Sequence, residues 1–174
     1  MEFSKLSEEI EQPEYYREQL VYNYLYKGPV LEWYMRVKLR LEGYYKMFHQ
    51  HLPKRGKILD IGCGYGFMSY MLKYLSPERE IFGIDYDEEK TDLAQHIYSR
   101  KKGLNFAHAD ILNFEFEKYD GIIIADVLHY LQPEQQKATI IKCFKSLNPG
   151  GTLIIRDGNA EMQQRHKGTK LTEF

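Results

Sequence analysis

The chain has 174 residues and a formal net charge of −1; 43% of its residues are hydrophobic and 28% are charged. This length and composition suit one globular domain with a single core. The longest basic cluster is the short Arg100-Lys101-Lys102, so the chain lacks the charge pattern of a nucleic-acid-binding protein. No window approaches the roughly 20 apolar residues of a membrane span, and residues 1–5 do not open a basic segment followed by an apolar stretch, so we expect a soluble cytoplasmic protein.

Residues 1–53 are predicted to form a helical cap. A helix is expected from Pro13 to about Tyr26, and Gly28-Pro29 should break it. Apolar residues then recur along one face from Val30 to Phe48, a spacing that predicts a second helix. Eight of the 15 tyrosines precede residue 46. Most of them are expected to pack over the core, since tyrosine is amphipathic.

From Lys57 onward, strands and helices alternate, a pattern typical of a parallel sheet with right-handed crossovers. We therefore predict an α/β fold over residues 54–174, with a three-layer, doubly wound, mostly parallel sheet that joins the cap in one structural domain. Gly150-Gly151 should stop the last helix in a left-handed turn. The predicted strands are 57–61, 80–84, 104–108, 119–125 and 151–156, and the predicted helices are 66–75, 87–100 and 133–147.

The segment from Ile58 to Met68 is the most informative part of the chain. A buried strand runs into Gly62-Cys63-Gly64-Tyr65-Gly66 and then opens a helix, and such glycines let backbone N–H groups approach a nucleotide-like ligand. A dinucleotide site requires G-x-G-x-x-G, but Phe67 stands where its third glycine belongs, which argues against a nicotinamide-dependent oxidoreductase. Asp60 precedes the first glycine by two positions, where its carboxylate can meet a cation.

Further carboxylates end the second and third predicted strands. Asp85 lies 19 residues after the last glycine of the turn, a spacing at which a carboxylate can accept hydrogen bonds from ribose hydroxyls. Asp87 fits a helix N-cap better, and Tyr86 between them can lie against an adenine-like ring or remain an exposed loop residue. Asp110 alone would indicate a turn. Together with Asp60 and Asp85, however, it gives three successive strands that end in aspartate, which favours an adenosine site.

These features resemble the class I S-adenosylmethionine-dependent methyltransferases, in particular their small-molecule branch. The resemblance rests on residues 59–66 and on Leu147-Asn148-Pro149-Gly150-Gly151 before an apolar strand, and it covers roughly residues 55–157. It implies a Rossmann-like fold, S-adenosylmethionine as cofactor, S-adenosylhomocysteine as product, and methyl transfer by in-line displacement. No metal is expected. The implied cofactor-binding residues are Asp60, Gly62, Cys63, Gly64, Asp85, Tyr86, Asp110, Ile111 and Asp126.

The loop after the fourth strand is expected to face the methyl acceptor. Of its polar residues Asp126, His129 and Tyr130, His129 is the predicted catalytic base, because imidazole titrates near neutral pH; a packing or capping role is the alternative. The chain lacks the Asn/Asp-Pro-Pro-Tyr/Phe motif with which related enzymes methylate exocyclic base amines. The expected acceptor is therefore a small-molecule or lipid-like compound and not a nucleic acid.

Two further expectations concern the cap and the cysteines. We hypothesise that Tyr22, Tyr24 and Tyr26 line the site, where they would suit an apolar or aromatic acceptor and offer cation–π contact to the sulfonium. Cys63 and Cys143 are not spaced for a metal or a disulfide framework and are expected to be structural.

The chain departs from the family after the fifth strand. Only 17 residues follow Asp157, too few for the helix and reversed strands that usually close the sheet. We expect the edge at Leu153–Arg156 to lack a partner strand, which implies either an oligomer that covers it or a chain cut from a longer parent protein. The alternative function is a methyltransferase-like module that binds S-adenosylmethionine but is inactive, or a truncated fragment.

Overall fold

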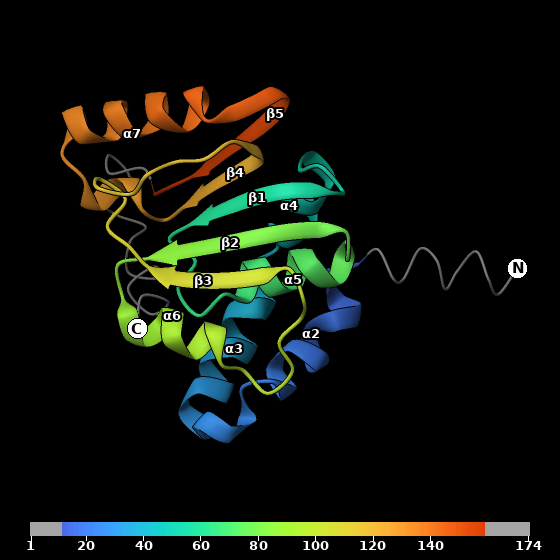
Figure 1. Cartoon of the computed structure of the whole chain (residues 1–174). Coiled ribbons are helices and arrows are strands. Elements are labelled where there is room, and N and C mark those ends of the chain that lie inside the picture. Colours follow the sequence, from blue (N-terminus) through green and yellow to red (C-terminus); the bar gives the residue numbers. More distant parts are fainter. Residues whose placement is uncertain (1–11, 159–174) are drawn as a thin grey trace, which may run out of the picture.

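The structure is a computed structural model that describes residues 12–158. Its centre is a parallel sheet of five strands in the order β3-β2-β1-β4-β5, which confirms the predicted α/β class (Figure 1). The order reverses beside β1, so a switch point lies at the carboxyl ends of the central strands, where ligands collect in such sheets. The strands are β1 (Gly56–Ile61), β2 (Arg79–Asp85), β3 (Leu104–His108), β4 (Tyr119–Ala125) and β5 (Leu147–Arg156).

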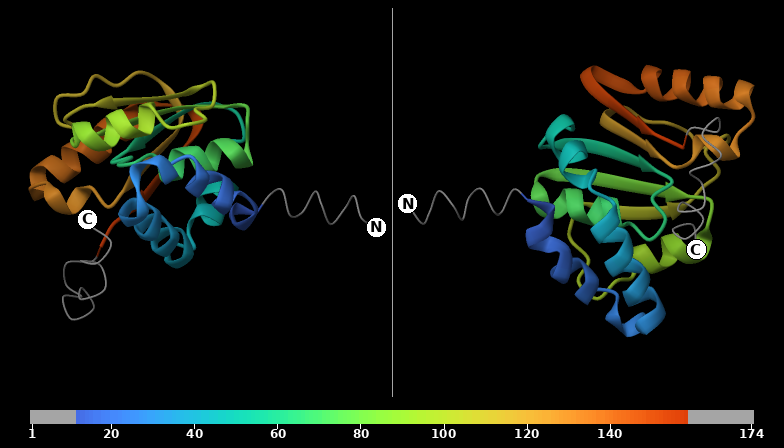
Figure 2. Two further views of the ribbon diagram at one scale, coloured as in Figure 1. Left: turned by 90° about the horizontal axis from the view of Figure 1, so that it is seen from below. Right: turned by 180° about the vertical axis from the view of Figure 1, so that it is seen from behind.

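Side chains on both faces of the central strands β1 and β4 are buried under helices, because successive strand residues point to opposite sides of the sheet. In β1, Ile58 packs with the N-terminal helices and α5, whereas Leu59 and Ile61 join the cluster that contains Cys143 of α7. Figure 2 shows the N-terminal helices gathered beside α5, and α7 lies next to β5 in Figure 1. The helices are α2 (Pro13–Tyr22), α3 (Pro29–Leu41), α4 (Tyr45–His51), α5 (Phe67–Leu75), α6 (Glu88–Gln95) and α7 (Pro133–Lys145), with 3₁₀ turns η1 (Leu25–Lys27) and η2 (Leu128–Tyr130).

The first predicted helix extends too far. It ends at Tyr22, and the side-chain amide of Asn23, the next residue, donates a hydrogen bond to the hydroxyl of Tyr74 in α5 at 2.6 Å. The 3₁₀ turn η1 follows before Gly28, whose φ of 93° breaks the helical path as predicted.

The second predicted helix is in fact two helices. α3 ends at Leu41 and α4 begins at Tyr45, and Glu42 between them has a non-helical backbone (φ −88°, ψ 85°). The buried carboxylate of Glu42 accepts a hydrogen bond from the Tyr45 hydroxyl at 3.0 Å and pairs with Lys38 at 3.0 Å. Both partners are near neighbours of Glu42 in the chain, and Gly43, which follows it at the break, disfavours one continuous helix.

Two later boundaries also differ. α6 ends at Gln95 and not near Arg100. The prediction that Gly150-Gly151 stops the last helix is wrong: α7 ends at Lys145, and the carbonyl of Ser146 already accepts from the N–H of Tyr119 in β4 at 2.9 Å. Gly150, with a φ of 79°, instead lies inside β5, where the pairing with β4 shifts register. Its left-handed backbone accommodates a bulge in a strand and not a helix end.

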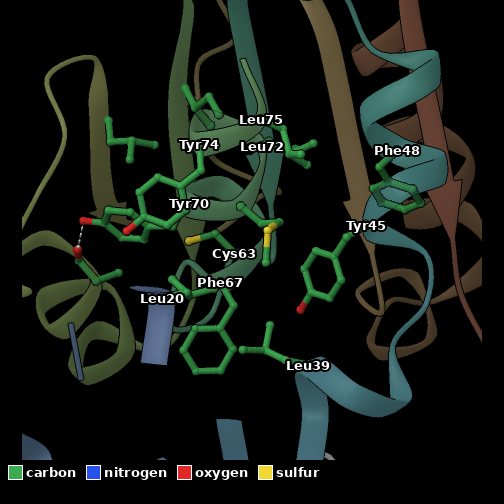
Figure 3. Close-up of a cluster of buried hydrophobic side chains, with 14 of the residues drawn as sticks. Leu20, Leu39, Tyr45, Phe48, Cys63, Phe67, Tyr70, Leu72, Tyr74 and Leu75 are labelled. Atoms are coloured by element: carbon green, nitrogen blue, oxygen red, sulfur yellow. Dashed lines mark hydrogen bonds between the residues drawn. The ribbon is translucent and has the colours of Figure 1, made fainter. Parts of the chain in front are cut away.

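The N-terminal helices share one core with the sheet. Figure 3 shows Leu20 of α2 and Leu39 of α3 beside Phe67 of α5, and Tyr70 of α5 and Phe48 of α4 belong to the same cluster. All five side chains are buried. Residues 12–52 therefore complete the helical layer on this face of the sheet.

Arg79, the first residue of β2, is a fully buried cation that joins three elements. Its guanidinium donates to the carbonyl oxygens of Pro53 at 2.7 Å, Leu72 at 2.9 Å and His49 at 3.1 Å. Burial lowers the pKa of Arg79 to about 10. The pKa of the neighbouring His49 is lowered to about 4, first by burial and then by the positive charges of Lys54 and Arg79.

β5 ends the sheet on one side. Within residues 12–158 no antiparallel strand follows it, and the expectation about the edge at Leu153–Arg156 stays a prediction because residues 159–174 lie outside the described part of the chain. In that described part, no helix has the length and apolar character needed to cross a membrane.

Candidate active site

Two adjoining cavities lie at the carboxyl ends of the strands. The larger has a volume of about 640 Å³, within the range of small-molecule sites, and the smaller a volume of about 110 Å³. The smaller cavity lies between the glycine turn and the N-terminal helices. Residues that line both are Tyr34, Glu42, Gly62, Gly64, Lys90, Ala125 and Asp126.

The structure brings most of the predicted cofactor residues to the larger cavity. Asp60 and Cys63 line only the smaller one, and His129 lines neither of the two. The predicted residues at the larger cavity are Gly62, Gly64, Asp85, Tyr86, Asp110, Ile111 and Asp126.

The glycine turn is fixed against β2. The backbone N–H groups of Gly62 and Cys63 donate to the carbonyl of Ile84 at 2.8 and 3.1 Å, and that of Gly64 donates to Oδ2 of Asp85 at 2.8 Å. A Cβ atom at Gly62 would lie 2.1 Å from Val127, whereas at Gly64 it would meet no atom within 4 Å. Gly62 is thus required for packing, and Gly64 leaves open space beside the cavity.

Asp85 is oriented by the backbone on both sides of it. Its Oδ2 holds the glycine turn, and its Oδ1 accepts from the N–H of Asp87 at 2.9 Å. Asp87 caps α6, because its Oδ1 accepts from the N–H of Lys90 at 3.1 Å, and this confirms the predicted N-cap. Tyr86 is 77% exposed and lies at the mouth of the cavity.

Asp110 forms a turn and also faces the cavity. Its carboxylate accepts from the N–H of Leu112 at 2.9 Å and from the side-chain amide of Asn113 at 2.8 Å. The turn-forming interpretation of Asp110 is therefore confirmed. Its contact with an adenine amino group, like that of the Ile111 N–H, is a proposal.

Asp60 is buried beneath the glycine turn, with 2% of its surface exposed. Its Oδ2 accepts from the hydroxyl of Ser69 at 2.5 Å. Burial raises the pKa of Asp60 to about 6, against the opposing effect of the Ser69 hydrogen bond and with a smaller contribution from the negative charge of Asp85. Cys63 beside it belongs to the apolar cluster in Figure 3, as expected for a structural cysteine, and burial raises the pKa of its thiol well above the usual value.

Asp126 has a left-handed backbone with a φ of 57°, the only such non-glycine residue in the described part of the chain. Its carboxylate forms an ion pair with Arg156 at the end of β5. The guanidinium of Arg156 also lies over the ring of Tyr44, 4.1 Å from its centroid. Burial alone would lower the pKa of Arg156, but the neighbouring Tyr44, Asp126 and Glu42 raise it.

The hypothesis that Tyr22, Tyr24 and Tyr26 line the site is wrong. Tyr22 and Tyr26 are exposed, and the buried Tyr24 donates to the carbonyl of Tyr65 behind the glycine turn, at 2.6 Å; none of the three lines either cavity. Tyr34 and Tyr44 line the site instead, because α3 and the break before α4 are the parts of the cap nearest the strand ends.

Sequence reasoning missed Glu42, Tyr34, Tyr44, Lys90 and Arg156 as site residues. Only Arg156 carried a usable signal, since it ends a strand as Asp85 does. Nothing in the local pattern of α3 marks Glu42 as a residue that turns inward.

His129 lies in the turn η2, beside the larger cavity and not in its lining. Its Nδ1 is 2.6 Å from Oδ1 of Asp157, the residue after β5. The ring also packs on Tyr130, which does line the cavity, at a centroid distance of 4.0 Å.

The donor and acceptor chemistry of the larger cavity fits an adenosine-like ligand. Carboxylates of Asp85 and Asp110 can accept from hydroxyl and amino groups, and Ile84, Ile111 and Leu112 offer apolar walls for a flat ring. A pyrophosphate would face these carboxylates unfavourably. The site therefore suits S-adenosylmethionine better than a dinucleotide.

The strand order and the glycine turn after β1 define a Rossmann-like methyltransferase fold, and solved structures share it. The PH0226 protein of Pyrococcus horikoshii is 26% identical, with 75% of this chain and 63% of that chain covered and a TM-score of 0.63. The fold of CalS10, an amino pentose methyltransferase from Micromonospora echinaspora solved with S-adenosylmethionine bound, is also similar: identity is 20%, coverage 66% and 48%, and the TM-score 0.55.

The family model described as "Methyltransferase domain" matches residues 58–151, and the chain belongs to this family of S-adenosylmethionine-dependent methyltransferases. A carboxy-S-adenosyl-L-methionine synthase of Campylobacter hominis is 26% identical over 125 residues, which are 71% of this chain and 53% of that protein. O-methyltransferase 3 of Dictyostelium discoideum is 31% identical over 134 residues, with 69% and 30% covered. The chain thus spans about half or less of the length of these relatives.

Proposed function

We propose that the chain binds S-adenosylmethionine in the larger cavity and transfers its methyl group to a small-molecule or lipid-like acceptor. The observation that carries this proposal is the clamp between the glycine turn and Asp85 at a cavity of about 640 Å³. In the proposed complex, Asp85 accepts hydrogen bonds from the ribose hydroxyls. Asp110 and the N–H of Ile111 contact the adenine, and Tyr86 covers the adenine ring.

The other predicted residues serve the methionine end. Gly64 lets the backbone approach it, Gly62 keeps the turn packed against Val127, Cys63 packs beneath the turn, and the carboxylates of Asp60 and Asp126 face its positive charges. When bound, the cofactor supplies a methyl group carried on a sulfonium, and in-line attack by the acceptor on the methyl carbon displaces the sulfur. The chain contributes orientation and a site from which water is excluded, and these can account for most of the acceleration.

The proposed acceptor class rests on the side of the site formed by the cap. Tyr34 of the cap borders the larger cavity with Val127, Tyr130 and Leu131 of the segment after β4, and Tyr44 lines the smaller cavity, which together suits an acceptor with apolar or aromatic parts. Arg156 lies there too, already paired with Asp126 and covered on one side by Tyr44. The name of the Dictyostelium relative, an O-methyltransferase, supports an oxygen acceptor as one member of this class.

Calorimetric titration of the purified chain with S-adenosylmethionine, S-adenosylhomocysteine and NADH tests the cofactor site. We expect binding of both adenosyl compounds and none of NADH. Asp85→Asn should weaken S-adenosylmethionine binding by about 1–3 kcal/mol, roughly 5- to 150-fold, because charge-assisted hydrogen bonds are lost. Asp92→Asn, on the exposed surface of α6, is the matched control and should leave the affinity unchanged. Equal affinities of the Asp85 variant and the unsubstituted chain would refute the ribose assignment.

A second candidate is a module that binds the cofactor without catalysis. The chain spans about half or less of the length of its curated relatives, which supports this candidate. It predicts tight binding of S-adenosylmethionine and no methyl loss to any acceptor, even in the presence of the remaining parts that a longer protein would contribute.

A further inference from the structure

A histidine and a carboxylate form a two-point contact at the carboxyl ends of β4 and β5. Nδ1 of His129 is 2.6 Å from Oδ1 of Asp157, and the backbone N–H of His129 donates to Oδ2 of the same carboxylate at 3.2 Å. The N–H of Gly158 donates to Oδ1 at 2.7 Å. Asp157 therefore acts as an acceptor in every one of these contacts, so the hydrogen between the two side chains belongs to Nδ1 of His129.

This contact fixes the state of the imidazole. A carboxylate that accepts from Nδ1 holds the neutral ring as the Nδ1–H tautomer, which leaves a lone pair on Nε2. The side chain of Asp157 is 15% exposed, and that of His129 is 31% exposed. The anchoring group is thus largely shielded from water, while the ring it orients is still accessible.

The pair lies where an acceptor can approach the cofactor cavity. Val127, Tyr130 and Leu131, on either side of His129 in the chain, all line the larger cavity. His129 packs against the ring of Tyr130 from outside that lining. A base must meet the acceptor and not the cofactor, so a position directly beside the cofactor cavity is the appropriate one.

The charged and titratable groups around His129 come from the two strand ends. Asp157 approaches from β5 and Tyr130 from the same turn as His129. Asp126 and Arg156, three residues before His129 and one before Asp157, neutralise each other in an ion pair. Among residues 12–158, Asp157 is the only carboxylate that contacts the His129 ring.

Building on the proposed function, we infer that Nε2 of His129 takes up a proton from the methyl acceptor and that Asp157 is its positioning residue. The acceptor is then a hydroxyl or an amine that carries an N–H. As the acceptor atom bonds to the methyl carbon, the carbon–sulfur bonding pair leaves on sulfur and the acceptor's proton moves to Nε2. A thioether or tertiary amine carries no such proton and has no need of the pair.

Long-range ¹H–¹⁵N NMR on the chain labelled with ¹⁵N-histidine measures the tautomer of the His129 ring. The imidazole resonances of His129 are assigned as those that disappear in the His129→Gln variant. We expect the Nδ1–H tautomer for neutral His129. Asp157→Asn can still cap the turn, but its amide can donate to Nδ1, so the Nε2–H population should rise, whereas Asp157→Glu should retain the original tautomer. An Nε2–H tautomer in the unsubstituted chain overturns the inference.

The position of Nε2 is tested by a pH titration of the same resonances with S-adenosylmethionine or S-adenosylhomocysteine bound. Only the former carries a sulfonium charge, so the midpoint of His129 should be lower with S-adenosylmethionine than with S-adenosylhomocysteine. Equal midpoints with both ligands bound overturn the proton-acceptor role alone. If calorimetry on the same samples shows no binding of either ligand, the proposed function fails and this role fails with it, whatever the tautomer.

Discussion

At the scale of single residues, the aspartates at the strand ends show how one residue type serves several purposes. Asp85 orders the glycine turn, Asp87 caps a helix and Asp110 closes a turn, each through hydrogen bonds from nearby backbone or side-chain groups. Asp60 differs because it is buried, with Ser69 as its hydrogen-bond donor. Aspartates at the ends of strands thus bring several carboxylates to one site, and the electrostatic environment differs from one carboxylate to the next.

Burial of Asp60 predicts a stability that depends on pH. A carboxyl group with a folded-state pKa of about 6, against an ordinary value of 3.8, binds more protons in the folded than in the unfolded chain between these limits. The free energy of unfolding should therefore fall as pH rises through this window and stay lower above it. Asp60→Asn removes the buried charge and should stabilise the chain by about 1–3 kcal/mol near pH 7.5, but not near pH 4.5.

Urea unfolding at these two pH values, with Asp92→Asn as an exposed control, measures the effect. A stability difference for Asp60→Asn that is the same at both pH values would contradict the electrostatic explanation. The same variant should bind S-adenosylmethionine more weakly, if Asp60 faces one of its positive charges as proposed. Stability and binding would then change in opposite directions, as expected when a functional site retains a buried charge.

At the scale of elements, β2 is tied to its surroundings by Arg79. Its guanidinium satisfies carbonyl oxygens at the end of α4, in the loop before β1 and in α5, none of which has a carboxylate to offer. Such a cation is stable only while its donors are all used, because an unpaired buried charge is costly. Arg79 thereby sets where α4 and α5 sit against the amino ends of the strands.

Arg79→Leu should destabilise the chain by about 3–5 kcal/mol, because the carbonyl groups of Pro53, Leu72 and His49 would lose their shared donor. Arg55→Leu removes an exposed arginine from the neighbouring loop and should change stability by less than about 0.5 kcal/mol. Chemical denaturation of both variants gives the comparison. A loss below about 1 kcal/mol for Arg79→Leu would show that water or a shifted backbone replaces its hydrogen bonds.

At the scale of the whole molecule, the N-terminal helices and the α/β core form one packed unit. Tyr24 of the cap lies edge-on against Phe67 and Tyr70 of α5, and Arg156 of β5 lies over Tyr44. These contacts join the ends of the described chain to its centre. A cap that separated from the core would expose fully buried side chains such as Leu20 and Phe48.

We therefore expect one cooperative unfolding transition. The chain has a single tryptophan, Trp33 in α3, so its fluorescence reports on the cap, whereas far-ultraviolet circular dichroism reports on all helices and strands. Both signals should give the same urea midpoint. A fluorescence transition at a lower urea concentration than the dichroism transition would indicate that the cap unfolds independently.

The sequence by itself determined the α/β class, the position of the glycine turn, and the aspartates at three strand ends. These features are local: a strand followed by glycines has few alternatives, and parallel strands necessarily bring their carboxyl ends to one edge. The predicted helix ends at Tyr26, Arg100 and Leu147 were less accurate, since helix boundaries respond to contacts outside the helix.

Only the tertiary structure decided which residues complete the site. The stacking of Arg156 on Tyr44 and the pairing of His129 with Asp157 each join segments that are far apart in the sequence. Periodicity records which face of an element is apolar, but it contains no information about which element lies opposite. For this reason the local sequence specified the proposed cofactor half of the site, and packing between distant segments specified the proposed acceptor half.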